Sequence, residues 1–197
     1  MWKPIFTRRH STASQQENDE LLSAPQVDLY VWDHVVRVGH WLLLLSILFA
    51  WLTRHGGGLW HEVFGYAALI IVGVRLVWGW CGTRHARFTS FLSGPGATLK
   101  YACAMMHGSE RRYTGHNPLG GWMIIALITT VMLISVTGWL YTTDRFWGVE
   151  WVETLHSRLT DGLFVLIGLH VCGVLYASWR HHENLVAAMI HGRKRPR

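Results

Sequence analysis

Four apolar blocks, each about 20 residues long, dominate the chain and are separated by polar stretches. They run over residues 35–53, 61–80, 119–141 and 156–179. An α-helix needs roughly 20 apolar residues to cross the hydrocarbon core of a bilayer, which is about 30 Å thick. The pattern therefore predicts an all-α fold, an integral membrane four-helix bundle with four transmembrane helices.

The polar stretches predict how the chain is organised around these helices. Residues 1–26 are polar and lack the apolar run of a secretory signal, so we expect a flexible tail there. Residues 27–182 form the predicted transmembrane domain, and residues 183–197 form a basic C-terminal tail. The long loop 81–118 contains Gly94-Pro95-Gly96, after which we expect a short helix along the membrane surface.

The basic residues predict the orientation of the helices. With Arg37 and Arg158, at the edges of their blocks, counted with the adjoining polar segments, the two termini and loop 81–118 together carry 14 Lys and Arg residues, whereas the other two loops carry 3. Basic loops stay in the cytoplasm, so both termini are predicted to be cytoplasmic. The same distribution argues against nucleic acid as a partner, since the net charge of +6 flanks the apolar blocks and forms no single patch.

Histidine is the polar residue whose placement suggests chemistry. Of the 13 histidines, nine lie in tails or loops, and most of those are expected to face water or lipid headgroups. The other four lie in or at the ends of the apolar blocks: His40, His61, His156 and His170. An ionisable group inside a membrane is costly and usually faces a partner in the bundle interior. A single buried histidine could simply be hydrogen-bonded, but four at matching depths favour a shared role.

The predicted topology places these four histidines at two depths. His40 and His170 lie near the cytoplasmic side, and His61 and His156 lie near the periplasmic side. His156 and His170 are fourteen residues apart, which is about four helical turns and roughly 21 Å along one face. Two facing imidazoles can ligate the iron of a haem from opposite sides. A zinc site would need all four ligands together, which this separation disfavours.

Two arginines in the apolar blocks fit the same interpretation. Arg37 precedes His40 by one turn, and Arg75 lies near the cytoplasmic end of the second block. Each guanidinium could bind a haem propionate, or could simply extend to the headgroups from the membrane interface. Both explanations stay open at this point.

Several short motifs resemble one known family. These are "RVGHW" at residues 37–41, "HEVFGY" at 61–66, "GHNPLGG" at 115–121, and the spacing of His156 and His170. Together they resemble the bacterial cytochrome b561 and nickel-iron hydrogenase b-type cytochrome family over nearly the whole chain after Val27. The resemblance implies a multi-pass protein of the bacterial inner membrane that holds two non-covalent haem b groups by bis-histidine ligation. The implied ligands are His40 with His170 and His61 with His156.

The resemblance also implies a function, which is electron transfer between the quinone pool and a redox partner. A periplasmic c-type cytochrome or dehydrogenase would dock at the acidic loop that contains Asp144, Glu150 and Glu153. Because loop 142–154 is short, we expect a compact cytochrome that serves a partner other than hydrogenase. A hydrogenase cytochrome subunit and a haem-free proton or metal transporter remain alternatives. Quinone oxidoreductase activity and homo-oligomer formation stay open.

Overall fold

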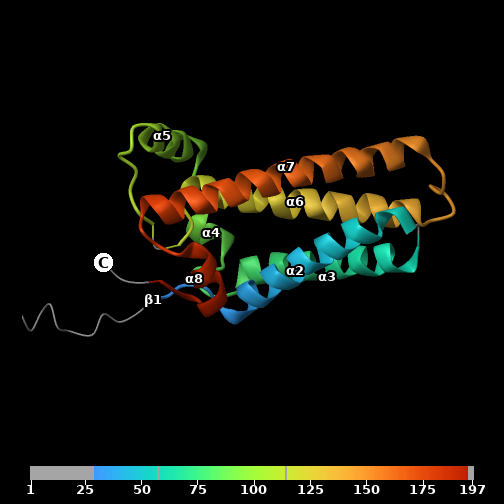
Figure 1. Cartoon of the computed structure of the whole chain (residues 1–197), viewed down its shortest axis with the longest axis horizontal. Coiled ribbons are helices and arrows are strands. Elements are labelled where there is room, and N and C mark those ends of the chain that lie inside the picture. The colour runs from blue at the N-terminus through green and yellow to red at the C-terminus, as the bar shows by residue number, and fades with distance from the viewer. Residues whose placement is uncertain (1–28, 57, 114, 195–197) are drawn as a thin grey trace, which may run out of the picture. The chain divides into compact units, whose positions relative to one another are not determined.

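The four longest helices of the computed structural model coincide with the apolar blocks (Figure 1). They are α2 (His34–Thr53), α3 (Leu59–Cys81), α6 (Pro118–Tyr141) and α7 (Glu150–Arg180). All four are long and apolar enough to cross a membrane, which confirms the predicted fold class. Helix α7 begins six residues before the apolar block it contains, because Glu150 to Leu155 continue the same helix into the preceding polar segment.

The structure describes residues 29–56, 58–113 and 115–194, so the predicted tail 1–26 lies outside the described residues. Residues Tyr30–Lys194 form one compact unit. Its shorter elements are η1 (Arg54–Gly56), α4 (Phe88–Phe91), α5 (Pro95–Met106) and α8 (Leu185–His191). Two strands of two residues each complete the list, β1 (Leu29–Tyr30) and β2 (Arg193–Lys194).

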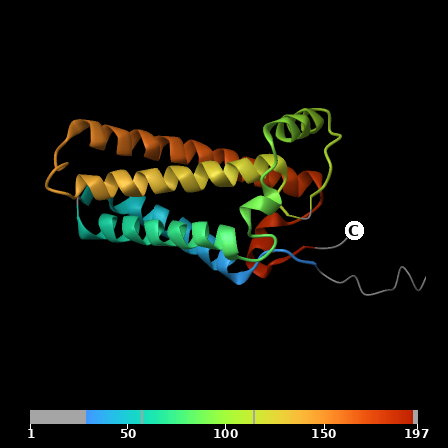
Figure 2. The same cartoon turned by 180° about the vertical axis from the view of Figure 1, so that it is seen from behind.

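Packing between the long helices follows their order in the chain. Helix α2 packs on α3, α6 packs on α7, and the two hairpins meet where α3 contacts α6 (Figure 2). The core lies at that meeting and is formed by Ala68, Val72, Phe88, Phe91, Ile128, Val131 and Leu163. We name the end where α2 begins the His40 end, and the end where α3 begins the His61 end.

Capping residues fix where the helices start at the His40 end. The side chain of Asp33 accepts from the Val36 N–H at 2.9 Å, which caps α2. The same carboxylate accepts from the Trp78 indole at 3.0 Å and from the Thr83 hydroxyl at 2.5 Å. Burial alone would raise the pKa of Asp33, but these hydrogen bonds outweigh it and lower that pKa. Asp33 therefore ties the start of α2 to the end of α3.

The C-terminal segment closes over the His40 end of the unit. The N–H groups of Val31 and Trp32 both donate to the Gly192 carbonyl, at 2.9 and 3.2 Å. Glu183 forms ion pairs with Arg112 and with Lys194. The segment predicted as a basic tail thus includes α8 and lies against the helices. The helix expected after Gly94-Pro95-Gly96 is present as α5.

Candidate functional site

The four membrane histidines come from three helices and lie toward the two ends of the bundle. Helix α7 contributes His156 and His170, α3 contributes His61, and α2 contributes His40. The imidazole rings of His61 and His156 lie 6.2 Å apart, centre to centre. His40 lies near the start of α2 and His170 in the second half of α7. The structure therefore brings His61 and His156 together as the sequence predicted, while the pairing of His40 with His170 stays a prediction.

Hydrogen bonds orient both rings of the pair at the His61 end. Nδ1 of His61 lies 2.8 Å from the Ala50 carbonyl, and Nδ1 of His156 lies 3.1 Å from the Ile134 carbonyl. Because a carbonyl only accepts, each Nδ1 carries the proton, and each Nε2 keeps its lone pair. This is the tautomer in which histidine binds a metal through Nε2, with Nδ1 held by a backbone acceptor.

The spacing of these two rings suits a shared metal ion. A histidine nitrogen lies about 2 Å from the metal it binds. Two imidazoles on opposite sides of one ion therefore have ring centres roughly 6 Å apart, and the observed separation is 6.2 Å. Within the described residues, no group of three or more His, Cys, Asp or Glu side chains could hold a metal ion. A metal whose remaining ligands come from a cofactor, as in haem, fits a pair of histidines.

Unpaired buried nitrogen atoms distinguish the His40 end. Among the described residues, buried side-chain nitrogens without a hydrogen-bond partner are Arg37 Nε, His40 Nδ1, Arg75 Nη1 and His116 Nδ1. All four lie at the His40 end. Buried donors are normally satisfied, so a group of them indicates a site for acceptor atoms that a bound molecule brings. Haem propionates would supply such acceptors, and the residues present therefore fit the cofactor.

Arg75 is held in place by contacts that leave one of its nitrogens available. Its Nη2 donates to the Ala86 carbonyl at 3.1 Å, and its guanidinium lies 5.1 Å from the ring centre of Phe88. Nη1 is the atom without a partner. Arg75 is therefore fixed within the bundle, and a purely headgroup-facing position does not describe it.

His116 is a residue whose position the sequence did not predict, since it was grouped with the loop histidines expected to face water. Its ring lies between Trp32 and Phe91, with centres 4.5 and 4.8 Å away. Burial, together with the nearby cations Arg75 and Lys194, lowers the pKa of His116 to about 3. The motif "GHNPLGG" is the feature of the sequence that could have distinguished His116 from the other loop histidines. In that motif the neighbouring Asn117 caps α6 through the Gly120 N–H, at 2.7 Å.

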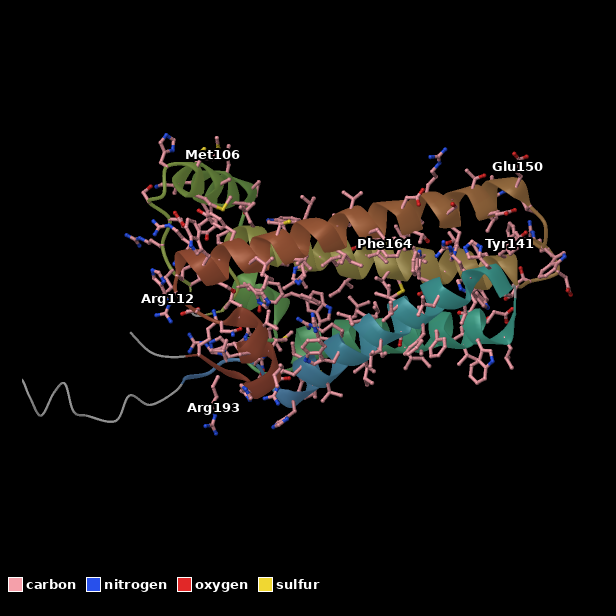
Figure 3. All side chains as sticks on the ribbon, in the orientation of Figure 1. Met106, Arg112, Tyr141, Glu150, Phe164 and Arg193 are labelled. Carbon is pink, nitrogen blue, oxygen red and sulfur yellow. The ribbon has the colours of Figure 1, made fainter. Side chains whose placement is uncertain are left out.

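Two small residues of α6 also contact the site without having been predicted. Thr137 Oγ1 lies 3.1 Å from His156 Nδ1. A Cβ added to Gly138 would lie 3.2 Å from His156 Cε1, so only glycine lets the ring sit there undisturbed. Figure 3 labels Tyr141 and Glu150 at the adjoining ends of α6 and α7. Threonine and glycine are common in membrane helices, so nothing in the sequence singled them out.

Comparison with known proteins agrees with this arrangement. A protein from Rhodobacter capsulatus named "Probable Ni/Fe-hydrogenase B-type cytochrome subunit" is 23% identical over 240 aligned residues, which cover 96% of this chain and 90% of that protein. A protein of the same name from Azotobacter vinelandii is 24% identical over 216 residues, covering 85% and 88%. No solved structure matches the chain. The family described as prokaryotic cytochrome b561 matches residues 31–192, and the chain therefore belongs to that family of haem b-binding membrane cytochromes.

Proposed function

We propose that the chain is a di-haem b-type cytochrome that transfers electrons between the quinone pool and a redox partner. The observation that carries the proposal is the 6.2 Å spacing of His61 and His156, with both Nδ1 atoms already engaged. His40 and His170 would hold the second haem at the other end of the bundle. Since His156 and His170 belong to one helix, the two haems would lie roughly 21 Å apart along the bundle.

When bound, haem b supplies a one-electron redox couple at the His40 end and another at the His61 end. The chain's own residues set the position and surroundings of each haem. His61 and His156 would hold one haem, and His40 with His170 the other. A haem held by two histidines would supply electron transfer and not oxygen activation.

Arg37 and Arg75 would bind the propionates at the His40 end. Each has a buried guanidinium nitrogen without a partner in the described structure, Nε in Arg37 and Nη1 in Arg75. A propionate that accepts from either guanidinium would neutralise the positive charge of that arginine, and charge-assisted hydrogen bonds of this kind are stronger than neutral ones. His116 Nδ1 lies in the same region and would add a neutral donor.

The distribution of basic residues supports an orientation in the bacterial inner membrane with the His40 end in the cytoplasm. Quinone would then react near one haem, and electrons would cross to the other. A periplasmic c-type cytochrome or dehydrogenase would dock at the His61 end, where Asp144, Glu150 and Glu153 form an acidic surface. Reversing these three charges should slow electron transfer to that partner, and an unchanged rate would remove the docking site.

A second candidate is the cytochrome subunit of a nickel-iron hydrogenase. It is favoured by the name of both relatives and by their coverage, since the chain spans 90% and 88% of their lengths. In that case the partner at the His61 end would be the hydrogenase. The short loop between α6 and α7 favours a different partner. Co-purification from the native membrane distinguishes the two.

Selective loss of one haem tests the proposed function. Purified His156→Ala and His170→Ala variants should each retain one haem, and reduction by a quinol in liposomes should no longer reach the opposite face. His107→Ala is the matched control, because His107 caps the end of α5, is exposed, and its side chain hydrogen-bonds the Cys103 carbonyl of that helix. If either membrane variant keeps two haems, the ligand assignment is wrong.

A further inference from the structure

A buried carboxylate lies outside the proposed haem sites, in the loop between α5 and α6. The side chain of Glu110 is 0% exposed, and its Oε1 lies 3.1 Å from Arg180 Nε and accepts from the Tyr176 hydroxyl at 3.3 Å. Its second oxygen, Oε2, is buried and has no hydrogen-bond partner among the described residues. Buried polar atoms are normally satisfied, so this oxygen marks a place where a proton can be received.

Two tyrosines accompany this carboxylate. Tyr176 comes from α7, one turn before Arg180, and Tyr101 comes from α5. Burial raises the pKa of Tyr101, the nearby Glu110 carboxylate raises that pKa further, and a hydrogen bond with Asn117 acts in the opposite direction. A hydroxyl group both donates and accepts a hydrogen bond, so it can pass on a proton. We name Glu110, Tyr101, Tyr176 and Arg180 the Glu110 cluster.

The Glu110 cluster connects the protein surface with the His40 end. Arg180 is the last residue of α7, its side chain is 41% exposed, and it also donates to the Gly108 carbonyl. On the inner side, Tyr101 is bonded to Asn117, which directly follows His116 in the chain. The buried Nδ1 of His116 is one of the unpaired nitrogens at the His40 end. The cluster therefore leads from water toward the proposed haem site at that end.

The His61 end has a tyrosine–glutamate pair of the same kind, but its carboxylate is in water. There the Tyr141 hydroxyl donates to Glu153 at 3.4 Å, and Glu153 is exposed. Within the described residues, Glu110 is the one acidic side chain that is buried. A sheltered acid–base group is therefore a feature of the His40 end.

Quinone chemistry needs such a group. Oxidation of one quinol to quinone releases two electrons, which two ferric haems would take up, and two protons, which have to reach water; reduction of quinone reverses both transfers. Acidic side chains at the bundle ends commonly relay such protons across the membrane boundary. A hydrogen bond from its own backbone N–H, together with the charge of Arg180, lowers the pKa of Glu110. The carboxylate is therefore ionised at neutral pH and ready to accept a proton.

We propose that Glu110 is the group through which quinone exchanges protons with the cytoplasm, and that quinone therefore reacts at the His40 end. The hydroxyls of Tyr101 and Tyr176 connect quinone with the carboxylate. A proton released by quinol passes to Oε2 of Glu110 and from there to water beside Arg180, while the electrons pass separately to haem. This inference rests on the proposed function, because it takes quinone as the substrate.

Two electron donors separate proton transfer from electron transfer. A short-chain ubiquinol analogue releases protons as it reduces the purified protein, whereas hexaammineruthenium(II) gives one electron and no proton. Glu110→Gln should slow haem reduction by the quinol about a hundredfold, as loss of an acid–base group does, and leave reduction by the ruthenium complex unchanged. Tyr176→Phe should slow the quinol reaction by a smaller factor. Glu110→Asp, which keeps a carboxylate, should react faster than Glu110→Gln.

Tyr141→Phe is the matched control, because it removes the corresponding tyrosine–glutamate hydrogen bond at the His61 end, and it should behave as wild type. If Glu110 only holds the α5–α6 loop on α7 through its ion pair with Arg180, Glu110→Gln should slow both donors equally or lose haem. That result, or a quinol reaction unchanged in both Glu110→Gln and Tyr176→Phe, would overturn the proposal. A wild-type protein that holds two haems and does not react with quinol would instead refute quinone as the substrate, and this inference with it.

Discussion

Thr137 offers a sharp test of how the protein holds the haem at the His61 end. Its hydroxyl lies 2.9 Å from the carbonyls of Leu133 and Ile134 and 3.1 Å from His156 Nδ1. Since the hydroxyl donates to a carbonyl, its oxygen accepts from the imidazole N–H. Thr137→Val keeps the shape of the side chain and removes this acceptor.

The expected effect is modest and specific to one site. The imidazole keeps the Ile134 carbonyl as an acceptor, so the substitution costs one neutral hydrogen bond, about 1 kcal/mol. That free energy corresponds to roughly fivefold weaker retention of the haem bound by His61 and His156. The haem at the His40 end should be unaffected.

Transfer of haem to excess apomyoglobin measures this retention directly. We expect one of two kinetic phases to accelerate about fivefold in Thr137→Val, while Thr129→Val, on an exposed position of the same helix, behaves as wild type. If the two variants release haem at the same rate, Thr137 does not support the ligand. If both phases accelerate, the effect is a general loss of packing.

Three further predictions concern single residues. Gly138→Ala should lower the haem-to-protein ratio by displacing His156, whose Cε1 would lie 3.2 Å from the new methyl group, and a ratio equal to wild type would contradict this. Asp33→Ala should reduce the free energy of unfolding by about 2 kcal/mol, because it removes a helix cap and leaves an indole N–H without its acceptor; Asp33→Asn, which keeps one acceptor oxygen, should cost less in the same chemical denaturation experiment. For His116, the folded-state pKa of about 3 lies below the unfolded value, so between these pKa values only the unfolded chain binds the proton. Stability should therefore fall as the pH drops, by about 1 kcal/mol between pH 7.5 and 5.5, and a thermal melt of His116→Asn that keeps the same pH slope would refute the assignment.

The sequence predicts the helices of this protein well because the bilayer imposes one simple requirement. A helix must be apolar over about 20 residues, and blocks 35–53, 61–80 and 119–141 match α2, α3 and α6 within two residues at each end. Helix α7 departs from the pattern at its start, where polar residues continue the helix. Hydropathy finds the apolar part of a helix and does not find a polar extension of it.

Of the residues at the site, the sequence predicted only the most unusual ones, the membrane histidines. Histidine is costly in a membrane, so its positions carry information, and helix direction and depth predicted the meeting of His61 and His156. Residues that act through ordinary chemistry, such as Thr137 and Gly138, could not be found in this way. His116 was missed for another reason, since its burial depends on Trp32 and Phe91, which come from distant parts of the chain.

Haem stoichiometry tests the central claim most directly. The wild-type chain, purified from membranes, should contain two haem b groups per polypeptide by pyridine haemochrome assay and protein quantitation. A reductive titration should resolve two bis-histidine centres in the reduced-minus-oxidised spectrum. One haem per chain, or none, would contradict the assignment of His40 with His170 and His61 with His156 as two separate sites.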